Sequence, residues 1–370
     1  MKQYILFVIT LLAITYTNAQ VELAFDAQSP KEYGITTVEA DSVYNKVKKL
    51  PDESQLSIAL IKNGVVRFYG VHRKNDSIFS VKNHQNVFEI GSISKVFTST
   101  MLAGLLLEDK LQVENYINDY LDIPFKDDQK ISFQMLSNHT SGLPRMPTNM
   151  IMNFFNGNNP FEDYGAENLK EYLKDTMNLA EFKKPGEFEY SNLGAGLLGY
   201  TLTQIEKANY ESLLQSRITT KYGLINTTTD RNKIIDLLLL GRNGGTVVPN
   251  WDMDVLVGAG GIKSNVEDLS KFALAQFDTA NEELNLTRIQ TTRVDENTSV
   301  GLGWLIKRTK NDRTLYAHDG GTGGYTSIMT IDCEHKNGVI ILSNISALGQ
   351  GMDKIHKLAR SLLNTIDDYR

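Results

Sequence analysis

The sequence predicts an α+β fold, with one antiparallel sheet built from both ends of the chain, flanked by helices, and an all-helical lobe inserted between. Strand patterns lie near both ends of the 370 residues, helical patterns fill the middle, and no repeat or linker divides them. We therefore expect one domain over residues 20–370. Residues of about 20–88 and 295–370 would form an α/β lobe, and about 89–294 the helical lobe.

The first nineteen residues form a separate segment, in which Lys2 precedes an apolar run from Tyr4 to Tyr16 and small or polar residues follow. This pattern predicts a secretory signal peptide over residues 1–19, cleaved before Gln20. A retained membrane anchor is disfavoured, because the apolar run is shorter than the ~20 residues of a membrane span. We therefore expect an exported protein, periplasmic or extracellular, with no membrane segment after cleavage.

Elements of the N-terminal half follow from local patterns. A helix is expected near 38–50, then two strands within 56–69 around Asn63-Gly64, a pair that favours a tight hairpin. Four helical patterns follow in the middle of the chain, at 92–109, 167–177, 193–207 and 264–276. Ser264 and Glu267 predict a capping box at the start of the last helix.

The C-terminal part reads as strands followed by a helix. Strands are expected at 300–308, 313–317, 325–333 and 339–343, the last two joined at Asn337-Gly338. The final helix carries an apolar stripe at 3.6-residue spacing, formed by Ile355, Leu358, Ala359, Leu362, Leu363 and Ile366. Such a stripe could lie on a membrane, but the mixed charges on its polar face favour packing against the sheet.

Composition excludes several classes of function. The net charge is −6, and because residues 1–19 hold one Lys and no acid, the mature chain would carry −7 (37 cations against 44 acids). An acidic surface gives no reason to bind nucleic acid. The lone Cys333 excludes an intramolecular disulfide, and six scattered histidines without paired cysteines indicate no metal site. We expect a monomer that acts on a small-molecule or peptide substrate.

The segment GSISK, residues 91–95, contains a candidate nucleophile and its base. Ser92 and Lys95 are separated by just under one helical turn, so their side chains share one side of a helix. A serine needs a neighbour to remove its proton, and a lysine can do so where burial lowers its pKa. Taken alone, however, S-x-x-K is frequent by chance.

Two further segments add polar groups. Tyr190 and Asn192 of YSN could supply a phenol for acid–base work and an amide for substrate binding, or could merely end a strand and cap a helix. In HDGGTGGY, residues 318–325, His318 is followed by Gly320 and Gly321, which would let a substrate approach a sheet edge. The alternative for this third motif is an ordinary hairpin turn.

With these three motifs in this order, the sequence resembles the serine β-lactamase and penicillin-binding-protein family, most closely its class C branch. NHTSGLP (138–144), KPGEFEYSN (184–192) and GAGGIKS (258–264) support the resemblance. It implies a beta-lactamase-like fold without metal or cofactor. It also implies that Ser92 is the acylated nucleophile, Lys95 its proton partner and Tyr190 a general base and acid. Asn192 would hold the substrate amide, and the N–H groups of Ser92 and Gly321 would form an oxyanion hole.

The same segment of the chain also contains a dinucleotide-binding pattern, G-x-G-x-x-G, at Gly194, Gly196 and Gly199. That turn needs a strand before it and a βαβ unit around it, and neither is evident. We expect instead that these glycines let a helix pack closely behind Tyr190.

One feature departs from the β-lactamase pattern, because His318 stands where many members have lysine. A histidine is mostly neutral at pH 7 and cannot offer a permanent charge to a substrate carboxylate. Arg145 could supply that charge, although a solvated loop arginine is the simpler interpretation.

Three functions remain open. The leading one is hydrolysis, through an acyl-enzyme, of D-amino-acid peptides from cell-wall material, with possible action on β-lactams. The others are a carboxylesterase and a penicillin-binding protein with little turnover.

Overall fold

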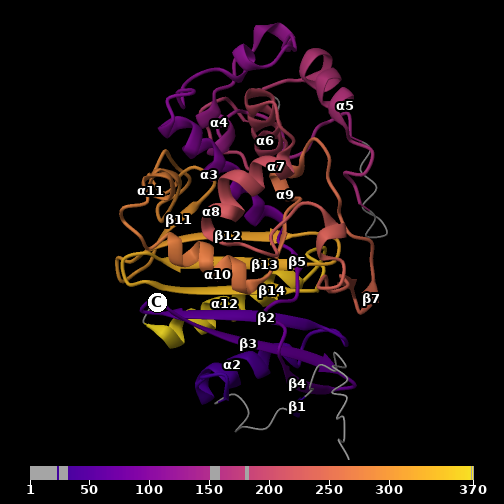
Figure 1. Ribbon diagram of the computed structural model, residues 1–370, viewed down its shortest axis with the longest axis vertical. Helices are drawn as coiled ribbons and strands as arrows, with labels where there is room; N and C mark the ends of the chain where they lie inside the picture. Colours follow the sequence, from indigo (N-terminus) through magenta and orange to yellow (C-terminus); the bar gives the residue numbers. More distant parts are fainter. Residues whose placement is uncertain (1–22, 25–31, 151–158, 180–182, 368, 370) are drawn as a thin grey trace, which may run out of the picture.

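The computed structural model describes residues 23–24, 32–150, 159–179, 183–367 and 369 (Figure 1). The predicted signal peptide therefore lies outside the described residues. None of the helices in these ranges has the length and apolar character needed to cross a bilayer.

A ten-stranded sheet joins the two ends of the chain (Figure 1). Every pairing is antiparallel, and the two halves meet where β2 pairs with β14. Across the sheet the strands are β1 (Leu23–Ala24), β4 (Ser77–Val81), β3 (Val65–Lys74), β2 (Gln55–Lys62), β14 (Asn337–Ser343), β13 (Thr326–Asp332), β12 (Thr314–Gly321), β11 (Leu305–Arg308), β10 (Thr298–Val300) and β9 (Thr292–Arg293). The predicted sheet built from both termini is confirmed.

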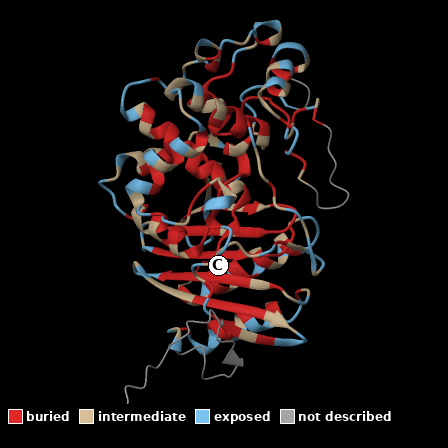
Figure 2. Ribbon diagram, turned by 45° about the vertical axis from the view of Figure 1, so that its right-hand side comes forward, coloured by how far each residue is buried: buried red, intermediate tan, exposed pale blue. Residues whose placement is uncertain are grey.

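Helices cover both faces of the sheet, so its central strands are buried on both sides (Figure 2). The covering helices are α2 (Thr37–Val47) and α12 (Gly351–Ile366) on one face and α10 (Val266–Ala275) on the other. In β2, Ile58 and Leu60 pack toward α2 and α12, whereas Ala59 packs in the core that contains α10. The apolar stripe of α12 is buried against the sheet and α2, as its mixed polar face predicted.

The helical lobe stands on the α10 side of the sheet, beside β12 (Figure 1). Its helices are α3 (Ser94–Leu107), α4 (Phe133–Ser137), α5 (Ala166–Glu171), α6 (Asn192–Glu206), α7 (Tyr210–Leu214), α8 (Thr220–Tyr222), α9 (Val257–Gly260) and α11 (Glu282–Thr287). The two-residue strand β5 (Phe88–Glu89), where the chain enters the lobe, pairs with β8 (Lys263–Ser264). β6 (Arg242–Asn243) and β7 (Thr246–Val247) form a separate hairpin.

The glycines of the G-x-G-x-x-G pattern lie inside α6 and not in a strand-to-helix turn. A Cβ at Gly196 would come within 2.6 Å of Leu256, and one at Gly199 within 3.1 Å of Gly258. They therefore allow α6 to pack closely against α9, as expected, and the dinucleotide interpretation is excluded for this segment.

Two local predictions are wrong. Asn265, not Ser264, caps α10, because Asn265 accepts from the Asp268 backbone N–H while Ser264 is held in β8. The β13–β14 hairpin does not turn at Asn337-Gly338. The left-handed residue is Lys336, with φ of 53°, and Asn337 already belongs to β14. By contrast, Asn63 and Gly64 have φ of 50° and 79°, as the predicted N-terminal hairpin requires.

The strand expected at 300–308 is divided into β10 and β11, and the third motif lies on a strand. Between β10 and β11 the chain approaches the helical lobe, where Gly303, with φ of 76°, packs against the Lys95 carbonyl. In the third motif, residues 318–321 continue β12 and do not form a loop. The end of β12 thereby becomes a rigid edge beside the lobe.

Candidate active site

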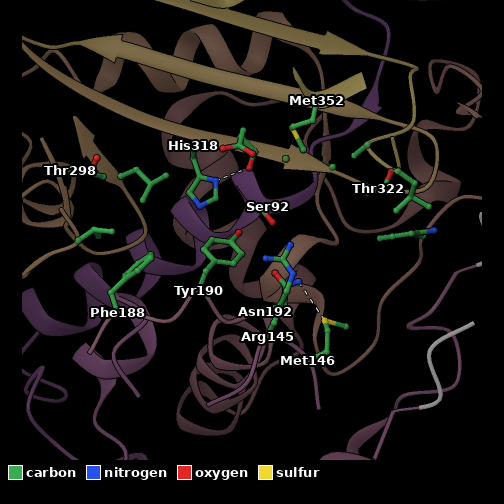
Figure 3. Close-up of a pocket in the computed structure, with 18 of the residues that line it drawn as sticks. Ser92, Arg145, Met146, Phe188, Tyr190, Asn192, Thr298, His318, Thr322 and Met352 are labelled. Atoms are coloured by element: carbon green, nitrogen blue, oxygen red, sulfur yellow. Dashed lines mark hydrogen bonds between the residues drawn. The ribbon is translucent and has the colours of Figure 1, made fainter. Parts of the chain in front are cut away.

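A cavity of about 820 Å³ opens where β12 faces the helical lobe (Figure 3). Its lining includes six of the seven predicted site residues, which are Ser92, Tyr190, Asn192, His318, Gly320 and Gly321. The seventh, Lys95, is only 1% exposed and lies beneath Ser92. Segments about 100 residues apart in the chain therefore meet at one place.

Ser92 lies in the short helix η1 (Gly91–Ile93), and Lys95 follows in the first turn of α3. The one-turn spacing brings Lys95 Nζ to 2.8 Å from Ser92 Oγ. Lys95 Nζ also lies 2.8 Å from Asn192 Oδ1 and 2.6 Å from the backbone oxygen of Ala259. Three oxygens thus surround one buried amine.

The electrostatic environment favours a neutral lysine. Burial lowers the pKa of Lys95 well below its ordinary value, Arg145 lowers this pKa further, and Asp319 opposes the change. A neutral amine has two N–H groups and one lone pair. Because the Ala259 carbonyl and Asn192 Oδ1 can only accept, the two N–H groups point to them. The lone pair then remains for the hydroxyl hydrogen of Ser92.

Tyr190 is held by the start of α6. The next residue, Ser191, caps α6 and donates its backbone N–H to His139 Nδ1 at 3.2 Å. The His139 and Tyr190 rings are 4.5 Å apart. Burial raises the pKa of Tyr190, a hydrogen bond with Ser92 opposes this, and Asp319 reinforces it. Tyr190 is therefore a protonated phenol beside the serine.

The Asn192 side chain is oriented by its contact with Lys95. Its Oδ1 faces the amine, so its Nδ2 points toward the cavity, where it donates to Met146 Sδ at 3.4 Å (Figure 3). A thioether is a weak acceptor. A carbonyl oxygen of a ligand could therefore replace it.

The two glycines of β12 allow close packing, of Gly320 against the residue before η1 and of Gly321 against Ala347. A Cβ at Gly320 would lie 2.0 Å from the Ile90 oxygen, and one at Gly321 would lie 2.3 Å from Ala347 Cβ. Thr322 donates its N–H to the oxygen of Tyr325, the residue before β13, and alternate amides of a strand point to opposite sides. The Gly321 N–H therefore points to the other edge, which is open because β11 pairs with β12 only as far as Ala317.

His318 is 3% exposed and offers no donor to the cavity at neutral pH. Its Nδ1 lies 2.7 Å from the Asp319 backbone oxygen, which can only accept, so Nδ1 carries a hydrogen. Burial lowers the pKa of His318 to about 4, against an opposing effect of Asp319. In the neutral ring Nε2 then carries no hydrogen, and its lone pair would repel a carboxylate.

Several residues of the site were not predicted from the sequence. His139 lies within the NHTSGLP segment, which could have revealed it. Asp319, whose carboxylate lies 3.7 Å from His356, depends on the strand register. The apolar lining comes from distant segments with no common signal, and includes Met146, Phe161, Phe188, Trp251, Leu348 and Met352. In the described ranges, no three His, Cys, Asp or Glu side chains are grouped so as to hold a metal ion.

Comparison with known proteins links this geometry to one family. The family model described as Beta-lactamase matches residues 45–363. Penicillin-binding protein 4* of Bacillus subtilis (strain 168) is 26% identical over 286 residues, which cover 70% of this chain and 61% of that protein. The matched part of this chain thus spans less than two thirds of that relative.

Solved structures share the fold at low sequence identity. The beta-lactamase/D-alanine carboxypeptidase from Pseudomonas syringae has a TM-score of 0.74 and 21% identity, over 90% of this chain and 99% of that one. The class C beta lactamase from Rhodobacter sphaeroides has a TM-score of 0.72 and 17% identity, over the same shares. The class C-like fold implied by the sequence motifs is confirmed.

Proposed function

This chain belongs to the beta-lactamase family, and we propose that it is a serine hydrolase in which Ser92 forms an acyl-enzyme with an amide or ester. The observation that carries the proposal is the contact of Ser92 Oγ with the buried amine of Lys95, at 2.8 Å, on the wall of an open cavity. Lys95 and Tyr190 would move protons. Asn192, His318, Gly320 and Gly321 would bind the substrate.

The acylation step follows from the protonation states. Lys95 Nζ takes the hydroxyl proton as Ser92 Oγ forms a bond to the substrate carbonyl carbon. The carbonyl electron pair moves to its oxygen. The bond to the leaving group then breaks as the Tyr190 phenol donates a proton to it, and the Lys95 ammonium returns a proton to Tyr190. Water repeats the cycle on the ester, with the same groups taking its proton.

Two backbone amides would stabilise the negative oxygen. Ser92 N–H lies in the first turn of the η1–α3 segment, where amide hydrogens lack carbonyl partners within the helix. Gly321 N–H points to the open edge of β12. Removing one such donor typically costs about a hundredfold or more in rate.

For the natural substrate we propose D-amino-acid peptides of cell-wall origin. Relatives named penicillin-binding protein and D-alanine carboxypeptidase support this class, and the predicted export would bring the site to wall material. β-Lactams would acylate Ser92, but the neutral His318 gives no charge for their carboxylate, so we expect inefficient turnover.

A carboxylesterase is the second candidate, favoured by the apolar lining of the cavity. Aromatic and thioether side chains such as Phe161, Phe188 and Met352 suit an uncharged acyl chain better than a peptide backbone. A penicillin-binding protein with little turnover would use the same acylation chemistry and differ only in the fate of the ester.

Mass spectrometry of the intact protein separates these functions. We would incubate it with β-lactams, D-alanyl peptides and short p-nitrophenyl esters, and follow adduct mass and product together. Transient adducts with turnover of D-alanyl peptides would support the peptidase, turnover of esters alone the esterase, and a lasting penicillin adduct the binding protein. Adducts or turnover that persist in Ser92→Ala would contradict the proposal itself.

A further inference from the structure

Arg145 lies on the wall of the cavity that contains Tyr190 and Asn192. Its backbone is fixed, because its carbonyl oxygen accepts from Asn192 N–H at 2.9 Å and from Leu193 N–H at 3.3 Å. Its guanidinium stacks on the Tyr190 ring, with Cζ 5.1 Å from the ring centroid. Figure 3 shows the guanidinium directed toward Ser92, beside the Tyr190 ring.

No carboxylate among the described residues forms an ion pair with this guanidinium. Within the described ranges, the Arg145 side chain makes no hydrogen bond or ion pair with another side chain, although it is held in one position by stacking. A planar guanidinium with free donors is suited to a carboxylate. Arg145 is an exposed loop residue, as the simpler interpretation of the sequence expected, and its side chain also lines the cavity.

The opposite wall, formed by β12 and β11, has a different charge pattern. Burial raises the pKa of Asp319, but a hydrogen bond with His356 and nearby positive charge, including Lys307, outweigh this effect and lower the pKa to about 2. Asp319 therefore lines the cavity there as a carboxylate. Lys307 lines the same wall and offsets this negative charge. Among the described lining residues, the excess positive charge therefore lies on the Arg145 wall.

We infer that Arg145 is a specificity-determining residue that binds an anionic group on the acyl part of the substrate. The acyl part is assigned to this wall because Asn192, the neighbour of Arg145, is the residue proposed to hold the substrate amide. The inference rests on the proposed function. It adds that the acyl group bears a carboxylate, whereas the leaving group faces a wall without net charge.

The test compares two esters that differ only in this charge. Mono-p-nitrophenyl glutarate carries a free carboxylate on its acyl chain, and its methyl ester is the neutral counterpart. We expect the wild-type protein to prefer the anion in kcat/KM, and Arg145→Gln to lower the anion-to-neutral ratio by about tenfold, the lower end for a charge-assisted hydrogen bond at an exposed side chain. Using a ratio cancels any common effect of the substitution on Lys95.

Three further variants and a change of salt concentration serve as controls for this test. Arg145→Lys should keep part of the preference. Lys307→Gln removes the other cation of the cavity, and Arg308→Gln removes an exposed arginine outside it, so both should leave the ratio within about twofold. The wild-type ratio should fall between about 20 mM and about 500 mM NaCl, because screening weakens exposed pairs.

The outcomes distinguish this inference from the proposed function. If both esters are cleaved in a Ser92-dependent way but Arg145→Gln leaves the ratio unchanged, the inference is wrong and the function stands. If Lys307→Gln instead abolishes the preference for the anionic ester, the anion binds at the β12 wall, and the inference about Arg145 is also wrong. Hydrolysis that survives Ser92→Ala would overturn the proposed function.

Discussion

The protonation state of His318 can be tested through the stability of the protein in acid. In the folded chain the pKa of His318 is lowered to about 4 by burial, whereas the ordinary value is 6.5. Between these pH values the unfolded chain binds a proton that the folded chain does not, so stability must fall as pH falls through this window. We expect His318→Asn to remove this loss, since an amide can still donate to the Asp319 oxygen.

The size of the effect follows from linkage. The two pKa values differ by about 2.5 pH units. At about 1.4 kcal/mol per unit, His318 alone would lower the free energy of unfolding by about 3 kcal/mol between pH 6.5 and pH 4. His139, whose pKa burial also lowers well below its ordinary value, adds a loss of the same sign in both proteins. The pKa of Asp319 is lowered to about 2, so its stabilisation is lost only at lower pH.

Urea denaturation from pH 7 down to about pH 4.5, followed by circular dichroism, gives the slope of unfolding free energy against pH. Only the difference in slope matters, so a constant loss of stability in the variant does not interfere. His84→Asn, at a half-exposed histidine outside the cavity, controls for the removal of one histidine. Equal slopes for wild type and His318→Asn would refute the view that His318 is neutral, and with it the argument that the third motif lacks a charge.

Three other changes test the chemistry of the site. The acylation rate, measured by stopped flow, should rise with pH through the lowered pKa of Lys95 and level off well below pH ~10. Arg145→Gln should move the midpoint of this rise to higher pH, and a rate that does not change with pH would contradict Lys95 as the base. His318→Lys should raise kcat/KM on benzylpenicillin relative to a neutral ester by about one to two decades, measured by hydrolysis, and no rise would count against our account of this position. Gly320→Ala should cost about 1–3 kcal/mol or more, because its Cβ would lie 2.0 Å from the Ile90 oxygen. A melting curve should show no comparable loss for Gly104→Ala, where the nearest atoms are 3.6 Å away.

The sheet could be predicted from the sequence because its strands follow local patterns of apolar residues and turn residues, which tertiary contacts do not override. Asn63-Gly64 turns as such a pair should, because its backbone contacts are compatible with the turn: Asn63 N–H donates to Asn337 Oδ1 and Gly64 N–H to the Lys336 oxygen. Asn337-Gly338 is the same dipeptide, but its asparagine accepts from the Asn63 N–H and donates to the Tyr369 hydroxyl. Those partners are distant in sequence, so propensity alone could not reveal that the turn forms earlier.

The site was predictable to different degrees for a similar reason. Ser92 and Lys95 share one helical turn, so spacing alone brought them together. Tyr190 and Asn192 came from family resemblance, since no local rule places residues about 100 positions later beside them. The position of Asp319 depends on the extension of β12 through the third motif, whereas the strand expected from the sequence ended at residue 317. The stacking of Arg145 on Tyr190 needed the loop geometry itself.

The protonation states also bear on which group is the base. Family resemblance gave Tyr190 both roles, but a phenolate is disfavoured here, since burial and Asp319 raise the pKa of Tyr190. The pKa of Lys95 is instead lowered, which favours the neutral amine. The hydrogen-bond partners of this amine are two acceptors and one hydroxyl. A base must be deprotonated and an acid protonated before the reaction begins. The resting site therefore favours Lys95 as base for acylation and Tyr190 as acid for the leaving group, an order in which neither group has to change its state before substrate binds.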